Sequence, residues 1–153
     1  MLNEGDSAPN PTLLMADGTE KPVSAWAGNP LVLYFYPKDD TPGCTTEAKD
    51  FSALAAEFAA AGVAVVGVSK DPSAKHQKFA AKHGLTIDLA TDADDSVCEA
   101  FGTWVEKSLY GRKYMGIDRA TFLIDADGKI ARIWRKVKVA GHAAQVLEAA
   151  KGL

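Results

Sequence analysis

The chain has 153 residues, of which 47% are hydrophobic and 24% are charged, a balance that excludes a disordered chain. Its length suits one globular domain that spans residues 1–153. Seventeen basic against twenty acidic side chains leave a net charge of −3 without a basic stripe, which argues against nucleic acid as the main partner. We therefore expect a protein that acts on a small molecule.

Neither membrane insertion nor export is expected from this sequence. No apolar run approaches the roughly eighteen residues that a membrane-spanning helix needs, and residues 1–10 lack the basic and apolar segments of a signal peptide. The two cysteines, Cys44 and Cys98, stand in no metal-type or CxxC spacing, so neither a zinc site nor a disulfide framework is predicted. A reducing, cytoplasmic location fits these features.

The first half of the chain predicts a parallel β-sheet. Residues 13–23 suggest a small N-terminal hairpin, whereas residues 31–36 and 63–68 are apolar, β-rich runs typical of strands buried on both faces. Between these runs, apolar residues recur at helical spacing until the expected terminator Gly62. They are Ala48, Phe51, Leu54, Ala55 and Phe58. A strand, a helix and a strand in this order indicate parallel pairing.

A second helix is predicted to begin near Asp71-Pro72 and to end at Gly84, because an acid suits the cap and proline the first turn. Its three lysines should face water. They are Lys75, Lys78 and Lys82. A short strand at residues 87–89 and a short helix at residues 94–101 are expected to follow.

The end of the chain predicts an antiparallel hairpin and a closing helix. Residues 121–124 and 130–139 flank a glycine-containing turn at 125–129, which indicates two paired strands. Residues 141–153 have the apolar spacing of a helix. The predicted fold class is therefore α/β, with a central mixed sheet flanked by helices.

The densest group of chemically active residues lies at residues 37–47, between the first core strand and the helix that follows it. Loops at the carboxyl ends of parallel strands are where α/β folds place ligands. Cys44 falls in or just before the first helical turn, where free backbone N–H groups favour an anion such as a thiolate. The alternative is an inert, buried thiol, which is a common fate of a free cysteine.

Three separate motifs carry a resemblance to a known family. Pro37, Thr41 and Cys44 match the Pro-x-x-x-Thr-x-x-Cys active-site motif of peroxiredoxins. Residues 34–48, 94–102 and 116–125 resemble the bacterioferritin comigratory protein (peroxiredoxin Q) subfamily, in the right order along nearly the whole chain. The resemblance implies a thioredoxin-like fold with peroxiredoxin additions, no metal or prosthetic group, and a peroxidase that contributes to antioxidant defence and cell redox homeostasis.

The resemblance also implies roles for individual residues. Cys44 would be the attacking (peroxidatic) nucleophile that reduces hydrogen peroxide or an organic hydroperoxide and becomes a sulfenate. Thr41 would hydrogen-bond the peroxide or the thiolate, Pro37 would shield the thiolate from water, and Arg119 would stabilise both reacting groups. The backbone N–H of Cys44 would be a further donor. Glu47, one turn after Cys44, would orient Arg119 or Thr41, or only suit the helix dipole.

The chain departs from the subfamily at Lys49, where many members carry a resolving cysteine five residues after the attacking one. Two routes then remain for the Cys44 sulfenate. In one, an external thiol such as a small thiol, a glutaredoxin or a thioredoxin attacks it directly; in the other, Cys98 is the resolving residue. The apolar helical context of Cys98 predicts a buried thiol, so we favour the one-cysteine cycle.

Other readings of the chain lead to different functions. A peroxide-sensing switch would use an oxidisable Cys44 without turnover, and steady-state peroxide consumption distinguishes it from an enzyme. A thiol–disulfide oxidoreductase is disfavoured by the lack of CxxC, and a nucleotide-binding enzyme by the lack of a glycine-rich motif in residues 63–70. No large apolar stripe demands assembly, so a monomer is expected.

The remaining polar and aromatic residues have weaker assignments. His76, His83 and His142 have no acidic partner at triad-like positions, and the first two, seven residues apart on one helix, are expected to be solvated. Three aromatic residues are placed in a loop before Arg119, where they either line the peroxide or reductant site or serve in packing. They are Trp104, Tyr110 and Tyr114.

Overall fold

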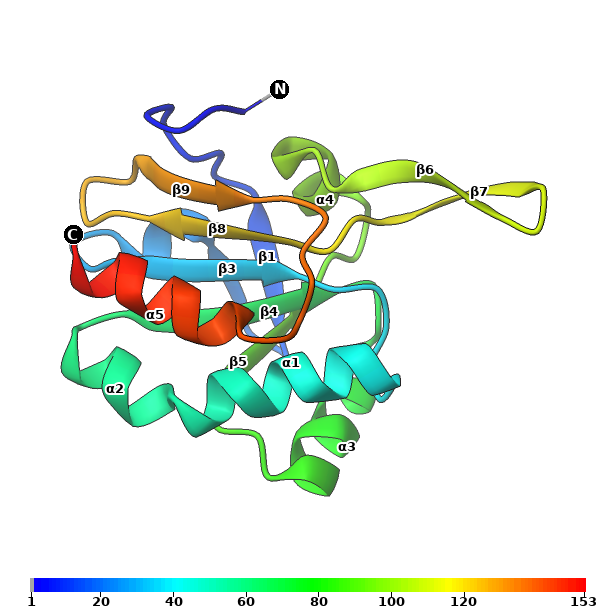
Figure 1. The fold of residues 1–153 in the computed structure, drawn as a ribbon, viewed down its shortest axis with the longest axis horizontal. Helices are drawn as coiled ribbons and strands as arrows, with labels where there is room; N and C mark the ends of the chain where they lie inside the picture. Colours follow the sequence, from blue (N-terminus) through cyan, green and yellow to red (C-terminus); the bar gives the residue numbers. More distant parts are fainter. Residues whose placement is uncertain (1) are drawn as a thin grey trace.

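The computed structural model describes residues 2–153, and its centre is a seven-stranded sheet in the order β2-β1-β5-β4-β3-β8-β9 (Figure 1). The strands of this sheet are β1 (Thr12–Met15), β2 (Glu20–Pro22), β3 (Leu31–Phe35), β4 (Ala64–Ser69), β5 (Asp88–Thr91), β8 (Ala120–Ile124) and β9 (Ile130–Trp134). Two further strands, β6 (Trp104–Leu109) and β7 (Arg112–Ile117), pair only with each other. The helices are η1 (Val23–Trp26), α1 (Pro42–Ala53), α2 (Ala55–Ala60), α3 (Ser73–His83), α4 (Ser96–Phe101) and α5 (His142–Lys151).

The middle of the sheet is parallel and its edges are antiparallel. Strand β3 pairs in parallel with β4, and β4 with β5, whereas β8, β9 and β1 add in antiparallel fashion. All five residues of β3 are buried, because helices or other chain segments cover both faces of the inner strands. The predicted mixed sheet, its N-terminal hairpin and its strand–helix–strand unit are confirmed.

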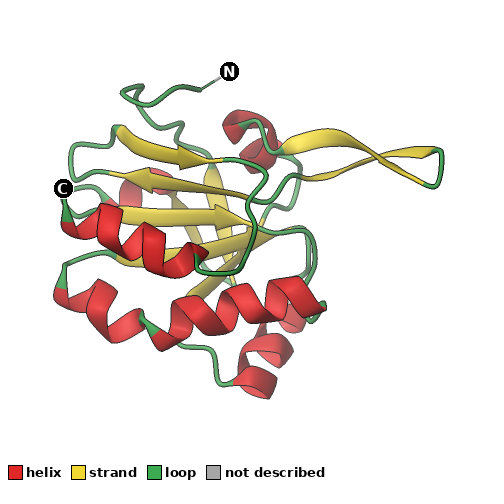
Figure 2. Cartoon of the chain, viewed as in Figure 1, coloured by secondary structure: helices red, strands yellow, loops and turns green. Residues whose placement is uncertain are grey.

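Two hydrophobic cores lie on opposite faces of the sheet. Alternate side chains of β3 enter different cores, with Val32 and Tyr34 on one side and Leu33 and Phe35 on the other. Helices α1, α2, α3 and α5 pack on the first side and α4 on the second, as the cartoon view also shows (Figure 2). The sheet therefore separates the surroundings of α1 from those of α4.

The long helix expected before Gly62 is divided into α1 and α2 at Leu54, the residue between them. Leu54 has φ −98° and ψ 3°, outside the helical region. Gly62 follows α2 with a φ of +75°, which glycine adopts without strain. Helix α3 ends at Gly84 in the left-handed conformation, as its sequence predicts.

The strand expected over residues 130–139 is too long, because β9 ends at Trp134. Beyond it the guanidinium of Arg135 donates to the carbonyls of Phe101 and Gly102, and Lys136 has a φ of +49°. The backbone N–H of Val137 then donates to the carbonyl of Arg119. The chain thus leaves the sheet edge to contact the segment between β7 and β8.

The loop expected before Arg119 is instead the β6–β7 hairpin, which extends from the body of the molecule (Figure 2). Tyr110 and Gly111 connect its strands with φ values of +51° and +77°, the conformation of a tight two-residue hairpin turn. No helix among residues 2–153 has the length and apolarity that crossing a membrane requires.

Candidate active site

Cys44 lies at the amino end of α1, at the carboxyl edge of the parallel strands. Thr41 is the residue that precedes the helix, Pro42 is its first residue and Cys44 its third. The backbone N–H groups of a first turn have no acceptor within the helix, so they and the helix dipole favour a negative charge at this position. Cys44 is only 2% exposed and belongs to the core beneath α1 and α5.

Arg119 brings its guanidinium onto Cys44 from the segment between β7 and β8. Its Nη2 lies 3.3 Å from Cys44 Sγ. Strand β8, which begins at the next residue, pairs Ala120 with Phe35 at the end of β3. The backbone N–H of Val137 holds the Arg119 carbonyl at 3.0 Å. Arg119 is therefore placed by the sheet on one side and by the segment after β9 on the other.

Gly43 leaves room for this approach. A Cβ atom at residue 43 would lie 3.3 Å from Arg119 Nη2, closer than a comfortable van der Waals contact. The absence of a side chain thus allows the guanidinium to lie against the first turn of α1.

Glu47 anchors the other edge of the same guanidinium. Its Oε1 accepts a hydrogen bond from Arg119 Nη1 at 2.6 Å, and its side chain is 1% exposed. Burial raises the pKa of Glu47 to about 7, although Arg119 acts to lower it. Burial also acts to lower the pKa of Arg119, but Glu47 and Cys44 outweigh it and raise that pKa above its ordinary value. Of the two roles weighed for Glu47, the structure shows contact with Arg119.

Thr41 and Pro37 lie on the loop that joins β3 to α1. The Thr41 hydroxyl donates to the carbonyl of Lys38 at 2.9 Å, which leaves the lone pairs of its oxygen free to accept a hydrogen bond. Pro37 is the second residue of this loop and is exposed. The structure therefore brings Arg119 and Glu47 onto Cys44 directly, and places Thr41 at the start of the same helix.

Comparison with known proteins now identifies the family. Residues 5–133 match the model described as the AhpC/TSA family. The chain belongs to this family of peroxiredoxins. Peroxiredoxin Bcp of Xanthomonas campestris is 50% identical over 139 residues, which cover 91% of this chain and 87% of the relative. Peroxiredoxin Bcp of Escherichia coli is 43% identical over 141 residues, which cover 92% and 90%.

Solved structures of related peroxiredoxins have the same fold. A crystal structure of a cysteine-to-serine variant of Xylella fastidiosa PrxQ has a TM-score of 0.94 and 41% identity, covering 99% of this chain and 97% of that one. The bacterioferritin comigratory protein of Xanthomonas campestris, in a study of its alkyl peroxide reduction activity, has a TM-score of 0.89 and 45% identity, covering 96% and 98%. This peroxiredoxin therefore has the expected thioredoxin-like fold and is a thiol peroxidase.

Tyr34 is a buried neighbour of the peroxiredoxin site that the sequence analysis missed. Its ring stacks on Phe51 of α1 with centroids 4.7 Å apart, and its hydroxyl is buried with no hydrogen-bond partner among the described residues. Burial raises its pKa, and the charges of Glu47 and Cys44 raise it further. The phenol is therefore neutral, and its ring belongs to the hydrophobic core beneath α1.

The expectation that His76 and His83 are solvated is wrong for His76, which is buried, whereas His83 is partly exposed; both contact acids on the loop before Cys44. His76 is fully buried, and its Nδ1 lies 2.7 Å from Asp39 Oδ2. Nε2 of His83 lies 2.8 Å from Asp40 Oδ1. His142 is buried as well, with Nε2 2.8 Å from the Thr121 hydroxyl.

The inward position of His76 and His83 was not predicted, although the spacing of apolar residues on their helix indicates it. Phe79 is buried on the same helix, three residues after His76 and four before His83. Residues at this spacing share one helix face, so the apolar Phe79 indicates that both histidines lie on the inward stripe.

The second cysteine of the peroxiredoxin, Cys98, lies on the other side of the sheet. It is fully buried in the core beneath α4, whereas Cys44 belongs to the opposite core. Both thiols are free. Burial raises the pKa of Cys98, and the nearby Asp92 raises it further, so this thiol stays protonated. The predicted burial of Cys98 is confirmed, and Lys49 is exposed on α1.

The three aromatic residues placed before Arg119 have different surroundings. Trp104 packs against the core beneath α4, and Lys70 Nζ lies 5.7 Å from its ring centroid. Tyr110 is 97% exposed at the tip of the hairpin, and Tyr114 is about half exposed. Core packing is thus the role of Trp104, and the two tyrosines project into solvent.

Proposed function

We propose that Cys44 is the peroxidatic residue of this peroxidase and that it reduces hydrogen peroxide and organic hydroperoxides through a sulfenate. The observation that carries the proposal is the contact of Arg119 Nη2 with Cys44 Sγ at 3.3 Å. A fixed guanidinium favours the thiolate and places donors where the peroxide oxygens would lie. The alkyl peroxide reduction activity described for the Xanthomonas campestris relative supports organic hydroperoxides as substrates.

In the attack step the thiolate sulfur forms a bond to the terminal peroxide oxygen while the O–O bond breaks. The released oxygen takes a proton and leaves as water or as an alcohol, and Cys44 keeps the other oxygen as a sulfenic acid. The backbone N–H of Cys44 and the Arg119 guanidinium would stabilise the developing charge. The Thr41 oxygen, whose proton is directed to Lys38, would accept a hydrogen bond from the peroxide.

Two further residues shape this site in the proposal. Glu47 is a positioning residue, because it binds the guanidinium nitrogen that does not face Cys44. Pro37 would restrict the loop and limit the access of water to the thiolate. Neither residue exchanges a proton with the peroxide in this scheme.

We further propose a one-cysteine cycle in which an external thiol attacks the Cys44 sulfenate. Its support is the placement of the two cysteines in different cores on opposite faces of the sheet, since a disulfide needs Cα atoms within about 7 Å. Lys49 supplies no thiol where many relatives carry one. The thiol of a small molecule, a glutaredoxin or a thioredoxin would displace water from the sulfenic acid and form a mixed disulfide with Cys44. A second thiol, from another small molecule or from the same protein donor, would then attack this disulfide and release Cys44 as a thiol.

Intact mass after one equivalent of hydrogen peroxide, without reductant, tests both proposals. We expect a gain of one oxygen in the native protein and no change in Cys44→Ser. Loss of two hydrogens would overturn the one-cysteine cycle, whereas oxygen uptake by Cys44→Ser would overturn the assignment of the attacking residue. Continued peroxide consumption with added thiol is expected of an enzyme, and a single turnover would identify a sensor.

A further inference from the structure

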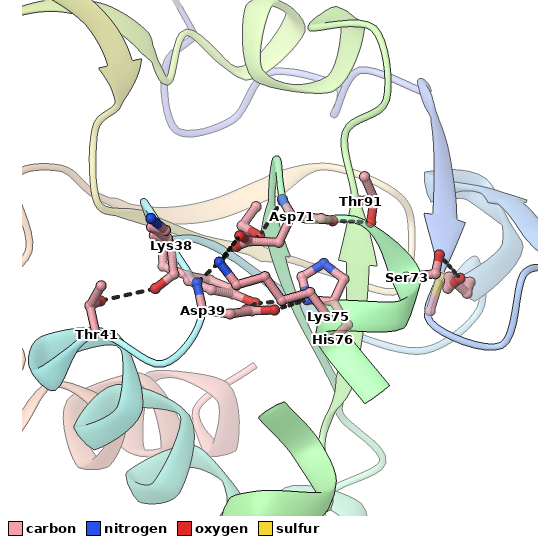
Figure 3. Close-up of polar contacts among 11 residues, drawn as sticks. Lys38, Asp39, Thr41, Asp71, Ser73, Lys75, His76 and Thr91 are labelled. Carbon is pink, nitrogen blue, oxygen red and sulfur yellow. Dashed lines mark hydrogen bonds and ion pairs between the residues drawn. The ribbon is translucent and has the colours of Figure 1, made fainter. Parts of the chain in front are cut away.

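We infer that Asp39 and His76 are positioning residues of the peroxide site: they hold the loop of residues 36–41 so that Thr41 and the first turn of α1 meet the peroxide in a fixed geometry. The inference rests on the proposed role of Cys44 and adds two residues of a buried polar cluster to it. Figure 3 shows this cluster, in which Asp39 of the loop and His76 of α3 point toward each other.

The Asp39 side chain has a close polar neighbour at each of its oxygens. Oδ1 accepts a hydrogen bond from the Tyr36 hydroxyl at 2.5 Å, and Oδ2 lies 2.7 Å from His76 Nδ1. The side chains of Asp39 and His76 are both fully buried. Because a buried polar group is costly without partners, these contacts favour one position of the Asp39 side chain.

The backbone of Asp39 is fixed as well. Its N–H donates to Asp71 Oδ2 at 2.8 Å, and the same carboxylate oxygen accepts from the Ser69 hydroxyl at 2.7 Å. Although burial acts to raise the pKa of Asp71, the hydrogen bonds from Ser69 and Asp39 and the contact with Lys75 lower it. Asp71 is therefore an anion that ties the loop to the end of β4.

Asp39 lies close enough to Thr41 along the loop to fix its position. Thr41 is two residues after Asp39, and Asp40 between them has a φ of +62°, a conformation that an L-residue keeps only when its surroundings fix it. The Thr41 hydroxyl donates back to Lys38, and its carbonyl accepts from the Thr45 N–H in the first turn of α1. Movement of Asp39 would therefore move Thr41 and the start of the helix.

The chemistry of His76 supports positioning rather than proton transfer. Its Nδ1 faces Asp39 and lies 3.4 Å from the Tyr36 hydroxyl, whereas its Nε2 is buried with no hydrogen-bond partner among residues 2–153. A buried pair of polar side chains also adds little net stability compared with apolar residues of similar volume, so its main effect is on geometry.

The test compares two reactions of Cys44 in the native protein and four variants. The variants are His76→Leu, Asp39→Ala with His76→Leu, His76→Asn, and Gln77→Ala. The double variant removes both members of the buried pair and is included in case His76→Leu folds poorly. Stopped-flow fluorescence measures the rate constant with hydrogen peroxide. Alkylation by iodoacetamide requires access to the thiolate but no alignment of a peroxide.

We expect the peroxide rate constant to fall about tenfold in His76→Leu and in the double variant, while alkylation changes by less than about threefold. His76→Asn, which keeps an N–H at the position of Nδ1, should restore most of the peroxide rate. Gln77→Ala is the matched control on the same helix, because Gln77 is exposed and donates to the carbonyl of Ala16, outside the loop of residues 36–41, and it should stay within about twofold of native.

Two results would overturn the inference. One is a native peroxide rate constant in a folded His76→Leu or double variant. The other is an equal fall of the peroxide and alkylation rates, which would indicate a general change of the thiolate or the fold. A failure of the proposed function is distinguishable, since it would already be seen as a native protein in which Cys44 does not react with peroxide.

Discussion

Glu47 Oε1 accepts a hydrogen bond from Arg119 Nη1 at 2.6 Å across seventy-two residues of sequence. The pair joins α1 to the segment before β8, and it leaves the second guanidinium nitrogen, Nη2, directed at Cys44. A guanidinium held on one edge by a buried carboxylate loses little freedom when it binds a second group. This geometry explains how an arginine far along the chain can serve a thiol at a helix start.

Replacement of Arg119 by Met should lower the rate constant of Cys44 with hydrogen peroxide by about 100-fold, because one fixed donor to the reacting atoms is lost. Stopped-flow kinetics measure this rate. Arg132→Met is a suitable control, since Arg132 is about half exposed and contacts Glu4 on the surface. A native rate in Arg119→Met would contradict the role of this residue.

The pKa of Glu47 predicts a dependence of stability on pH. Burial raises this pKa from 4.5 to about 7 in the folded protein, so between these values the folded state binds more protons than the unfolded state. Stability is then lost as the pH rises from about 4.5 to about 7, by about 3 kcal/mol at most. Glu47→Gln should lack this loss. The Tm of the native protein should therefore fall relative to the Tm of Glu47→Gln as the pH rises from 5 to 8.

His142 has the opposite effect on stability over an overlapping range of pH. Burial lowers its pKa from 6.5 to about 4, so the unfolded state binds the extra proton and stability rises with pH between these values. Comparison of native protein with Glu47→Gln cancels this contribution, because His142 is present in both. A Tm difference that does not change with pH would contradict the raised pKa of Glu47.

Cys98→Ser should retain the native peroxide rate within about twofold and show the same gain of one oxygen in intact mass. The reason is that the Cys98 thiol is buried in the core beneath α4 and its pKa is raised by burial and Asp92. A small loss of Tm is expected, since serine places a hydroxyl in an apolar site. Loss of turnover in this variant would restore the two-cysteine cycle.

Gly67→Ala should destabilise the protein by about 2 kcal/mol, measured by denaturant unfolding. A Cβ at residue 67 would lie 2.6–2.9 Å from ring atoms of Tyr34, and that ring is fully buried. Gly116→Ala is the matched control in another strand. There the nearest atoms are side-chain atoms of Lys107 and Tyr114 at 3.3 Å or more, so its effect should stay below about 0.5 kcal/mol.

The parallel core of the fold was predictable because its signals are local. Residues 31–36 and 63–68 are continuous apolar runs, and Gly62 and Gly84 end helices with positive φ. The β6–β7 hairpin was not predictable from periodicity. Most of its residues are exposed or half-buried on both faces, so apolar and polar residues do not alternate as they do in a strand with one buried face.

The candidate site was predictable in part for a similar reason. The position of Cys44 at a helix start indicated a reactive thiol from the local sequence, whereas Thr41 and Arg119 were identified only through the resemblance to peroxiredoxins. The contact of Asp39 with His76 joins two elements that follow neighbouring parallel strands. Such a contact depends on how α3 docks on the sheet, and no single segment of the sequence contains that information.

The sheet between Cys44 and Cys98 has a consequence for how the enzyme handles oxidising equivalents. In the proposed one-cysteine cycle, no second thiol of the chain takes over the oxidation, so an oxygen accepted by Cys44 stays on that sulfur until an external thiol donor arrives. The lifetime of the oxidised enzyme is therefore set by the concentration of that donor. When donor is scarce and peroxide abundant, further oxidation of the same sulfur competes directly with repair, and catalytic capacity declines with each such event.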